Sequence, residues 1–427
     1  VHSAKFANEG DVDNIRQTIL RYDLRHPVVN DADFRIWRAY AVRAWPTTVL
    51  IDPRGYVIDA HAGEGVWAAY ADVLAEAIPR YDAQGLLDRT PLPLVLEREA
   101  AANTELKYPG KLLADEAGER LYIADSGHNR VMITDLQGRV LEVIGADTRG
   151  LADGAYEQAQ FAYPQGLALD SESATLYVAD TENHAIRAID LDARTVRVVA
   201  GNGRQGRYVI KPGRAAATSL SSPWDLVLVG TRLYIAMAGL HQLWMLDLDA
   251  GTVGPYAGSG AEALVDGPLA QAALAQPSGI TSDGRVLYFA DSESSAIRSA
   301  DLDPAGGVHT LIGQGLFDFG DQDGTRHRAR LQHPLGVAWY QGRLYIADTY
   351  NHRIKVIDPL AQQVRTLAGA GRGNADGERA RFYEPSGLSG AGGRLYVADT
   401  NNHAVRAIDL AGGLVSTLTL QDTHGRL

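Results

Sequence analysis

One pattern of apolar and polar positions recurs along most of the chain. In its fifth occurrence it reads LYIADTYNHRIKVID, residues 344–358: an apolar run, an Asp, a polar bend that ends in His, and a second apolar run. Successive copies are 51 to 57 residues apart, measured between their tyrosines, and this period indicates an array of repeated supersecondary units. The tyrosines stand at Tyr122, Tyr177, Tyr234, Tyr288, Tyr345 and Tyr396.

Each repeat offers four short strands. A run such as PQGLALD (164–170) precedes the two central runs, and a run such as TVRVVAG (195–201) follows them. Short β-rich runs separated by Gly, Asp and Asn turns are typical of propeller blades. The six repeats therefore predict an all-β, six-bladed propeller over residues 106–420. Because apolar side chains alternate along these strands, we expect them to pack between neighbouring blades.

The linkers between repeats are long and are expected on one face. In a four-stranded antiparallel meander, the bend between the second and third strands shares a face with the linker that enters the next blade. Examples of these linkers are residues 146–163, 201–222 and 313–333, whereas tight turns lie on the opposite face. Insertions on one rim usually mark the binding side of a repeat protein.

Residues 1–80 do not share the repeat. Their apolar spacing predicts a helix over 11–22, a strand over 27–30 and a second helix over 33–42, which Asp33 caps.

A hairpin and a third helix complete this first segment. WPTTVLIDPRGYVI (45–58) predicts two strands about a type I turn, and residues 63–78 predict an amphipathic helix. Residues 81–105, with prolines and mixed polarity, are expected to be a linker, and residues 421–427 a tail.

Composition and charge exclude several classes of protein. The chain has 427 residues, of which 45% are hydrophobic, so globular folding is expected. A net charge of −12 argues against wrapping nucleic acid or lying on an anionic membrane. Cysteine is absent, so these residues form no disulfide or thiol nucleophile, and the redox compartment stays open. Val1 opens a sequence that reads like the inside of a domain, so we expect a fragment.

The recurring Asp and His of the bend are the first candidates for chemistry. Asp can accept hydrogen bonds from backbone N–H groups of the bend, and His can donate one to a neighbouring blade. A catalytic site rarely needs the same residue in nearly every blade, so we expect a structural role for these residues. They are Asp125, Asp180, Asp291, Asp348, Asp399, His184, His352 and His403.

The third repeat departs from the pattern. Trp224 and Asp225 stand where other repeats have the P-x-G-L motif, and Met237 replaces the Asp of the bend. If a ligand pocket exists at the mouth of the propeller channel, we expect Trp224, Asp225, Met237 and His241 to line it as substrate-binding residues. A locally repacked blade is the alternative.

Metal binding is a less favoured possibility. A ring of His would bind zinc only if three ligands converged within about 2.0–2.1 Å of one ion, and these His residues lie in turn-forming positions. DFGDQDG (318–324) suggests a calcium loop, but the twelfth position from Asp321 is Gln332 instead of a Glu. We therefore expect no metal and no cofactor.

Arginines cluster in the same linkers, as in Arg204, Arg207 and Arg214. Residues 1–90 carry −3 of the total of −12, which leaves −9 for residues 91–427. An RNA-binding propeller would more often be basic, so the charge favours solvated surface or an acidic protein partner over nucleic acid.

The repeated YIADxxNHxI pattern, with its preceding DG…F…PxGL segment, resembles NHL repeats, a six-bladed propeller family. The order of residues 1–80, with Trp45-Pro46-Thr47 before the hairpin, is similar to the carboxy-terminal part of a thioredoxin-like domain. HPVVNDADFRIWRAYAVRAWPTTVLIDPRGYV and the aberrant third repeat both resemble the NHL-repeat-containing protein 2 family, in which a thioredoxin-like domain precedes an NHL propeller.

This resemblance implies that the Trp45–Pro46 bond is cis and makes Trp45, Pro46 and Thr47 candidates for binding substrate beside a redox-cysteine loop. The alternative is a turn that conserves the fold and binds no substrate. Those cysteines are absent here, so no catalytic residue is expected in this chain. A β-rich segment that follows the propeller in the family is also expected to be missing. The resemblance favours the cytoplasm, although the residues themselves identify no compartment.

The function we expect is that of a two-module protein. The propeller would be a platform for a protein or peptide client on its long-linker face, and the complete first domain would be a thiol-disulfide oxidoreductase. The alternative is a non-enzymatic interaction scaffold. A metal-dependent propeller enzyme and an RNA-binding NHL protein are less favoured, and we expect a monomer without membrane or nucleic-acid partners.

Overall fold

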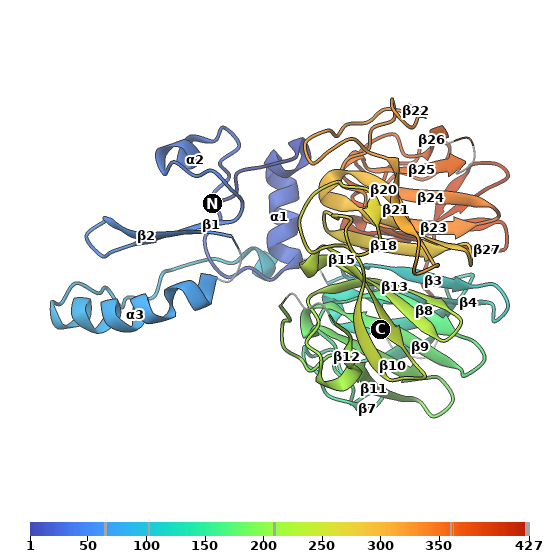
Figure 1. Ribbon diagram of the computed structural model, residues 1–427, viewed down its shortest axis with the longest axis horizontal. Helices are drawn as coiled ribbons and strands as arrows, with labels where there is room; N and C mark the ends of the chain where they lie inside the picture. Colours follow the sequence, from blue (N-terminus) through green and yellow to red (C-terminus); the bar gives the residue numbers. More distant parts are fainter. Residues whose placement is uncertain (64–65, 101–102, 208–210, 359–360, 362, 423–427) are drawn as a thin grey trace. The chain divides into compact units, whose positions relative to one another are not determined.

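The computed structural model describes residues 1–63, 66–100, 103–207, 211–358, 361 and 363–422. The chain divides into two compact units, Val1–Ala102 and Asn103–Leu427. The three α-helices of the described residues lie in the first unit, and the large sheets lie in the second (Figure 1).

The first two helices of the first unit begin where polar side chains satisfy their free N–H groups. After a 3₁₀ turn, η1 (Ala7–Gly10), the helix α1 (Val12–Arg21) begins at Asp11, whose carboxylate accepts the N–H of Asn14 at 3.2 Å. For α2 (Arg35–Ala39), the capping carboxylate is that of Asp31, not the predicted Asp33. Asp31 accepts the N–H groups of Ile36 and Trp37, both at 2.9 Å.

The strand predicted over residues 27–30 is not formed. Within the described residues this stretch makes one isolated bridge, between His2 and Asn30. A strand needs a neighbour along its length, and apolar composition alone does not supply one.

The predicted hairpin is present. It joins β1 (Thr47–Ile51) to β2 (Val57–Ala62), and its turn is closed by the N–H of Gly55, which donates to the carbonyl of Asp52 at 2.9 Å. The Trp45–Pro46 bond before it is cis, as expected. The helix α3 (Val66–Ala83) and a 3₁₀ turn, η2 (Glu97–Ala100), complete the unit.

The second unit is the predicted six-bladed propeller, and each blade is an antiparallel four-stranded meander. Blade 1 comprises β3 (Leu112–Asp115), β4 (Arg120–Asp125), β5 (Arg130–Asp135) and β6 (Val140–Ile144). Blade 2 comprises β8 (Pro164–Asp170), β9 (Thr175–Asp180), β10 (Ala185–Asp190) and β11 (Thr195–Ala200). Blade 3 comprises β13 (Pro223–Val229), β14 (Arg232–Met237), β15 (Gln242–Asp247) and β16 (Thr252–Ala257).

The remaining blades repeat this order. Blade 4 comprises β18 (Pro277–Ser282), β19 (Val286–Asp291), β20 (Ala296–Asp301) and β21 (Gly307–Ile312). Blade 5 comprises β23 (Gly336–Tyr340), β24 (Arg343–Asp348), β25 (Arg353–Asp358) and β26 (Gln363–Ala368). Blade 6 comprises β27 (Pro385–Ala391), β28 (Arg394–Asp399), β29 (Ala404–Asp409) and β30 (Val415–Thr417).

Each linker passes the outer edge of the blade it enters. In four blades it adds a two-residue strand to that edge, and the fourth strand of the blade is its partner. These short strands are β7 (Gly154–Ala155), β12 (Gly213–Arg214), β17 (Gly267–Pro268) and β22 (Gly324–Thr325).

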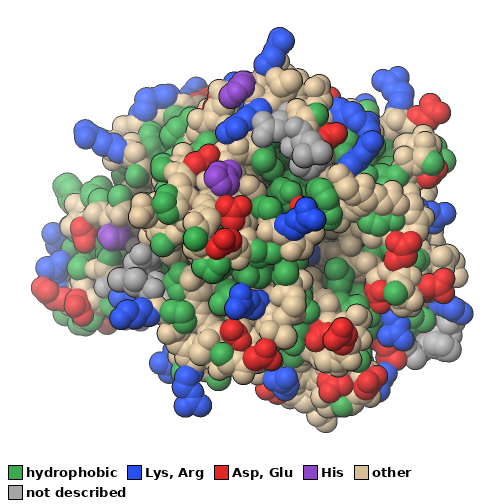
Figure 2. Space-filling view, turned by 45° about the vertical axis from the view of Figure 1, so that its right-hand side comes forward, with side chains coloured by type: hydrophobic (Ala, Val, Ile, Leu, Met, Phe, Trp, Pro, Cys, Tyr) green, Lys and Arg blue, Asp and Glu red, His purple; other side chains and the backbone are tan. Residues whose placement is uncertain are grey.

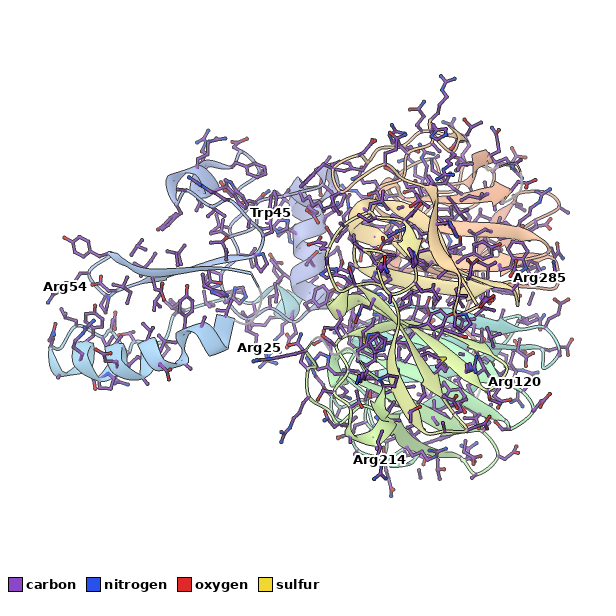
Figure 3. The ribbon with its side chains drawn as sticks, in the orientation of Figure 1. Arg25, Trp45, Arg54, Arg120, Arg214 and Arg285 are labelled. Atoms are coloured by element: carbon purple, nitrogen blue, oxygen red, sulfur yellow. The ribbon has the colours of Figure 1, made fainter. Side chains whose placement is uncertain are left out.

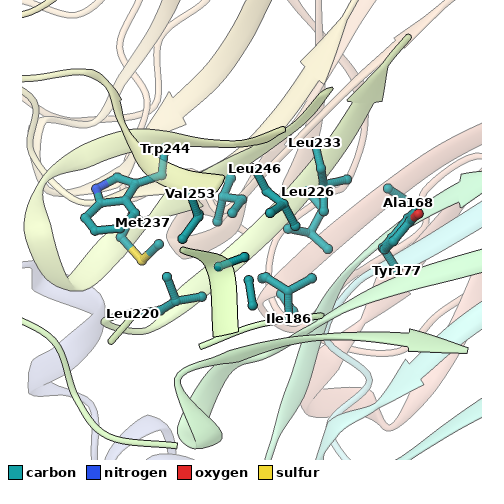
Figure 4. Packing of buried hydrophobic residues seen from close by; sticks show 14 of the residues in the cluster. Ala168, Tyr177, Ile186, Leu220, Leu226, Leu233, Met237, Trp244, Leu246 and Val253 are labelled. Carbon is teal, nitrogen blue, oxygen red and sulfur yellow. The ribbon is translucent and has the colours of Figure 1, made fainter. Parts of the chain in front are cut away.

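The apolar core is divided among the boundaries between blades. Both faces of the second strand are buried, as in β4, where Leu121 through Asp125 are inaccessible to solvent. One cluster fills each boundary; that between blades 2 and 3 includes Ile186, Leu226 and Trp244 (Figure 4). Burial of one such aliphatic side chain contributes roughly 1.5–3 kcal/mol, so the boundaries supply most of the stabilisation.

Blades 6 and 1 close the ring without exchanging a strand. Residues 418–422, which follow β30, cross to the outer edge of blade 1, where the carbonyl of Gln421 accepts the N–H of Val140 at 3.0 Å. The N–H of Gln421 donates to Gly138 at 2.9 Å, and the hydroxyl of Tyr396 donates to the carbonyl of Leu136 at 3.0 Å. Leu420 is buried at this seam.

Candidate functional site

The bends between second and third strands form one layer on the long-linker face, which we define as the face that carries these bends and the linkers between blades. Each bend is a three-residue 3₁₀ turn that follows the Asp position and ends at a left-handed residue, with φ between 49° and 55°. Its Asp accepts the N–H of a residue at the end of the entering linker. The pairs, donor first, are Lys107 to Asp125 (2.7 Å), Ala162 to Asp180 (2.7 Å), Ala275 to Asp291 (2.7 Å), Gln332 to Asp348 (2.8 Å) and Tyr383 to Asp399 (2.7 Å).

The left-handed residue of each bend bonds to the next blade. Its side chain accepts a backbone N–H, so the recurring His acts through an unprotonated Nδ1. This corrects the expectation that His donates. The pairs, donor first, are Tyr163 to Asn129 (2.9 Å), Ser222 to His184 (3.1 Å), Gln276 to His241 (3.2 Å), His333 to Ser295 (3.1 Å), Glu384 to His352 (3.2 Å) and Tyr108 to His403 (3.1 Å).

Burial acts on the charge state of this layer. It lowers the pKa of the His184 imidazole, with a smaller raising effect from Glu182, and so favours the neutral ring that accepts the N–H. The same loss of solvent raises the pKa of buried Asp carboxyls. The hydrogen bonds and cations around these carboxyls act in the opposite direction but are outweighed. The resulting pKa values are about 6 for Asp180, about 7 for Asp348 and about 6 for Asp399.

In four blades, a buried Arg or Lys stands on the third strand, seven residues after the Asp of the bend, and its charge faces that Asp. In blade 2, Arg187 lies 3.0 Å from Asp180 and 2.8 Å from Asp153, the Asp of the linker's Asp-Gly pair. These cations were not singled out from the sequence. The aligned repeats do carry the signal, because Arg or Lys recurs there at Arg187, Arg298, Lys355 and Arg406.

Blade 3 replaces this ionic network by an apolar one. Met237 takes the place of the Asp, Trp244 that of the Arg, and Pro212 that of the linker Asp. Met237 and Trp244 are fully buried and lie side by side in one cluster (Figure 4). The indole N–H of Trp244 donates to Gln242 at 3.0 Å. Three coupled replacements therefore remove the buried charges together, which avoids an unpaired ion.

The four residues expected to line a pocket in this blade do not meet. Met237 is in the core and His241 accepts the N–H of Gln276 in blade 4. Asp225 faces the central axis, where its carboxylate accepts the N–H of Ile280 at 3.1 Å. Trp224 is half-buried on β13. The locally repacked blade, which was the alternative interpretation, describes Met237 better.

The central channel is lined by the P-x-G-L segments of the six innermost strands. Their third position is Gly in four blades, because neighbouring backbones come too close for a side chain: a Cβ on Gly279 would lie 2.7 Å from the carbonyl oxygen of Leu335. Blades 1 and 3 carry Lys111 and Asp225 instead, and these two side chains pair at 3.8 Å. The channel is thus crossed by a buried ion pair.

The predicted substrate-binding residues of the first unit, Trp45, Pro46 and Thr47, are consecutive in the sequence. Trp45 is 47% exposed and its indole N–H donates to the carbonyl of Ser3 at 2.8 Å. Its ring lies 4.4 Å from that of Trp37, and the hydroxyl of Thr47 donates to the carbonyl of Ala44 at 2.7 Å. Figure 3 shows where Trp45 stands.

The acidic residues of the 318–324 loop are occupied by cations of the protein. Asp318 pairs with Arg330 at 2.5 Å, and Asp321 and Asp323 bind the Lys355 ammonium at 2.8 and 3.0 Å. Within the described ranges, no group of three His, Asp or Glu side chains is arranged to hold a metal ion.

One linker differs from the others in charge. Linker 201–222 carries Arg204, Arg207, Lys211 and Arg214 and no acidic residue, and all four cations are exposed. Among the residues that the structure describes, none of the four takes part in an ion pair. The backbone N–H of Arg204 donates to the side chain of Asn202 at 3.1 Å, and Arg214 lies on β12 and points outward (Figure 3).

Comparison with known proteins identifies the repeat. A family model described as NHL repeat matches residues 161–189, 331–357 and 382–408, in blades 2, 5 and 6. A structural genomics protein of unknown function from Bacteroides thetaiotaomicron aligns with a TM-score of 0.53 at 15% identity, over 72% of this chain and 70% of that chain. The chain is therefore an NHL-repeat protein with a six-bladed propeller.

Relatives with higher sequence identity to this chain define the class of protein more closely. Protein SUPPRESSOR OF QUENCHING 1, chloroplastic, of Arabidopsis thaliana is 44% identical over 100% of this chain and 42% of its own length. NHL repeat-containing protein 2 is 41% identical in Gallus gallus and 40% in Homo sapiens, over 98% of this chain and 62% of each relative. The chain is homologous to NHL repeat-containing protein 2 and spans less than two thirds of these relatives' length. No helix of the described part is long and apolar enough to cross a membrane.

Proposed function

We propose that the propeller is a binding platform for a protein or peptide client, which docks on the long-linker face. The observation that carries the proposal is linker 201–222, where four exposed cations stand without an acidic partner among the described residues. A protein folds more stably when such like charges are dispersed or paired, so their concentration favours a role in binding. The ion pair across the channel supports a rim site instead of an axial one.

The partner chemistry follows from the charge. Residues 91–427 carry a net charge of −9, so an extended polyanion such as RNA would be repelled by most of the propeller. Figure 2 shows acidic and basic side chains interspersed over one face of the molecule. A short acidic segment of a protein can bind Arg204 and Arg207 locally and avoid the acidic remainder. We therefore propose an acidic peptide segment as the client's docking element.

A labelled peptide of eight glutamates tests this proposal directly. We expect fluorescence anisotropy at low salt to show binding, and Arg204→Glu combined with Arg207→Glu to weaken it about tenfold, since each exposed pair contributes roughly 0.2–1 kcal/mol. The matched control is Arg326→Glu with Arg328→Glu in linker 313–333, where acidic residues balance the basic ones. Equal loss in both variants, or tighter binding of a uridine oligonucleotide than of the peptide, would contradict the proposal.

For the first unit we propose a thioredoxin-like domain over residues 1–80, followed by a linker over 81–105. The order α1, α2, hairpin, α3 and the Trp45–Pro46–Thr47 segment before β1 support it. In the longer protein this domain would be a thiol-disulfide oxidoreductase to which the propeller presents clients, with Trp45, Pro46 and Thr47 at the substrate.

A non-enzymatic scaffold is the second candidate, and the absence of cysteine from these 427 residues favours it for this chain. Insulin reduction by the full-length protein, with its cysteines and with each replaced by serine, separates the two functions. Turnover that depends on a cysteine pair supports the oxidoreductase. Absence of turnover, with peptide binding intact, supports the scaffold.

A further inference from the structure

The ammonium of Lys111 occupies the centre of the propeller and contacts three other blades. Its side chain is 4% exposed, and the ammonium donates to the carbonyl oxygen of Leu335 in blade 5 and to that of Ser386 in blade 6, the latter at 3.1 Å. The carboxylate of Asp225, in blade 3, lies 3.8 Å away. Three oxygens therefore surround an ammonium that has three N–H groups to donate.

Asp225 is held in place independently of the lysine. One carboxylate oxygen accepts the N–H of Ile280 in blade 4 at 3.1 Å, and the other accepts the N–H of Leu226 at 2.9 Å. Burial raises the pKa of Asp225 and lowers that of Lys111, while the charge of each partner opposes both shifts. The two groups are matched in charge and in hydrogen bonding, as a buried pair requires.

Because the surrounding glycines have no side chains, backbone oxygens line the propeller axis. Without side chains at the third P-x-G-L position, the inner strands approach one another, and a Cβ on Gly387 would lie 2.7 Å from both the carbonyl oxygen of Gly110 and the Cα of Lys111. Backbone carbonyl oxygens together with one carboxylate make a typical environment for a hard cation. The only Lys or Arg at this position of the six segments is Lys111.

We propose that the propeller axis contains a cation site, formed by the carbonyls of Leu335 and Ser386 and the carboxylate of Asp225, which the chain fills with its own Lys111 ammonium. The site takes a primary alkylammonium ion when the lysine side chain is shortened. This inference does not depend on the client-binding role proposed for the long-linker face. The cation at the axis thereby connects blades 1, 3, 5 and 6.

Chemical rescue tests the site. Truncation in Lys111→Ala leaves the Asp225 carboxylate buried and unpaired, and we expect the thermal midpoint to fall by roughly 5–10 °C. Added n-propylammonium, which carries the carbons and the ammonium that the truncation removes, should raise the midpoint of this variant and saturate as a bound ligand does. Tetramethylammonium, which has no N–H donors, is the matched control and should have no effect.

With Lys111→Ala, either of two outcomes would overturn the proposal. One is a Lys111→Ala variant as stable as the native chain. The other is an equal response to n-propylammonium in the native chain and the variant, which would show a solvent effect. If Lys111→Ala does not fold, Lys111→Met with and without Asp225→Asn decides the matter. We expect the double variant to be more stable than Lys111→Met alone, because it removes the unpaired carboxylate, and the reverse order would refute the site.

Discussion

At the scale of single residues, the recurring histidine combines a backbone and a side-chain role. His184, His241, His352 and His403 all have left-handed φ values, a conformation that Asn also adopts readily, as Asn129 does in blade 1. Each ring then accepts an N–H from the next blade through Nδ1. Because only the unprotonated nitrogen accepts, and burial lowers the pKa of His184, the boundary at His184 is coupled to pH.

We predict that His184→Asn retains most of the stability at pH 7.5, whereas His184→Ala loses about 1–2 kcal/mol with the inter-blade hydrogen bond. Burial lowers the pKa of His184, so the unfolded chain binds its proton more readily. This contribution to stability is present above pH 6.5, the ordinary His value, and is lost as pH falls through the lower pKa of the folded state.

Urea unfolding at pH 7.5 and pH 5.5 measures both effects. The difference between the native chain and His184→Asn isolates the histidine from nearby carboxyls such as Asp180, whose raised pKa acts in the opposite direction. A native chain that loses no more stability on acidification than His184→Asn would rule out the coupling.

At the scale of elements, the repeat is a bend joined to a third strand by a buried ion pair, and blade 3 shows that an apolar set can replace it. Arg187 and Asp180 are fully buried, as are Trp244 and Met237 at the same positions. Both solutions leave no unpaired buried charge, so the fold requires matched partners more than it requires charges.

Removing one member of the buried ion pair is expected to lower the stability of the protein. Arg187→Met leaves Asp180 and Asp153 without their shared cation and should lower the free energy of unfolding by about 3–5 kcal/mol. Met237→Leu at the equivalent layer of blade 3 conserves volume and should cost less than about 1.5 kcal/mol. Chemical denaturation of both variants measures the difference. Similar costs for the two variants would show that the ion pair has no special part in blade stability.

The repeat period and strand alternation predict the six blades, because each depends on local spacing that the sequence displays. Three features escaped prediction because they depend on distance in space. Asp31 caps α2 in place of Asp33, because the path of the preceding loop brings the Asp31 carboxylate to the N–H groups of the helix. The bonding direction of His184 depends on the N–H that faces it. Lys111 and Asp225 come from different blades and meet only when the ring closes.

At the scale of the whole molecule, the ring depends on its closing seam. Leu420 and Gln421 lie at the outer edge of blade 1, where Leu420 is buried and Gln421 is bonded in both directions. We predict that a chain ending at Thr417 loses about 2–4 kcal/mol of stability, since it loses these hydrogen bonds and one buried leucine. Hydrogen exchange should then rise first at β6 and β30, and unchanged protection there would contradict this role of the seam.

The central functional claim is that a client binds on the long-linker face through linker 201–222. A photo-reactive amino acid at position 204 tests it, with position 285 as the control, since Arg285 lies in a tight turn of the opposite face, between β18 and β19 (Figure 3). With the glutamate peptide as probe, we predict crosslinks from position 204 and none above background from position 285. Crosslinking from position 285 that equals or exceeds that from position 204 would contradict it.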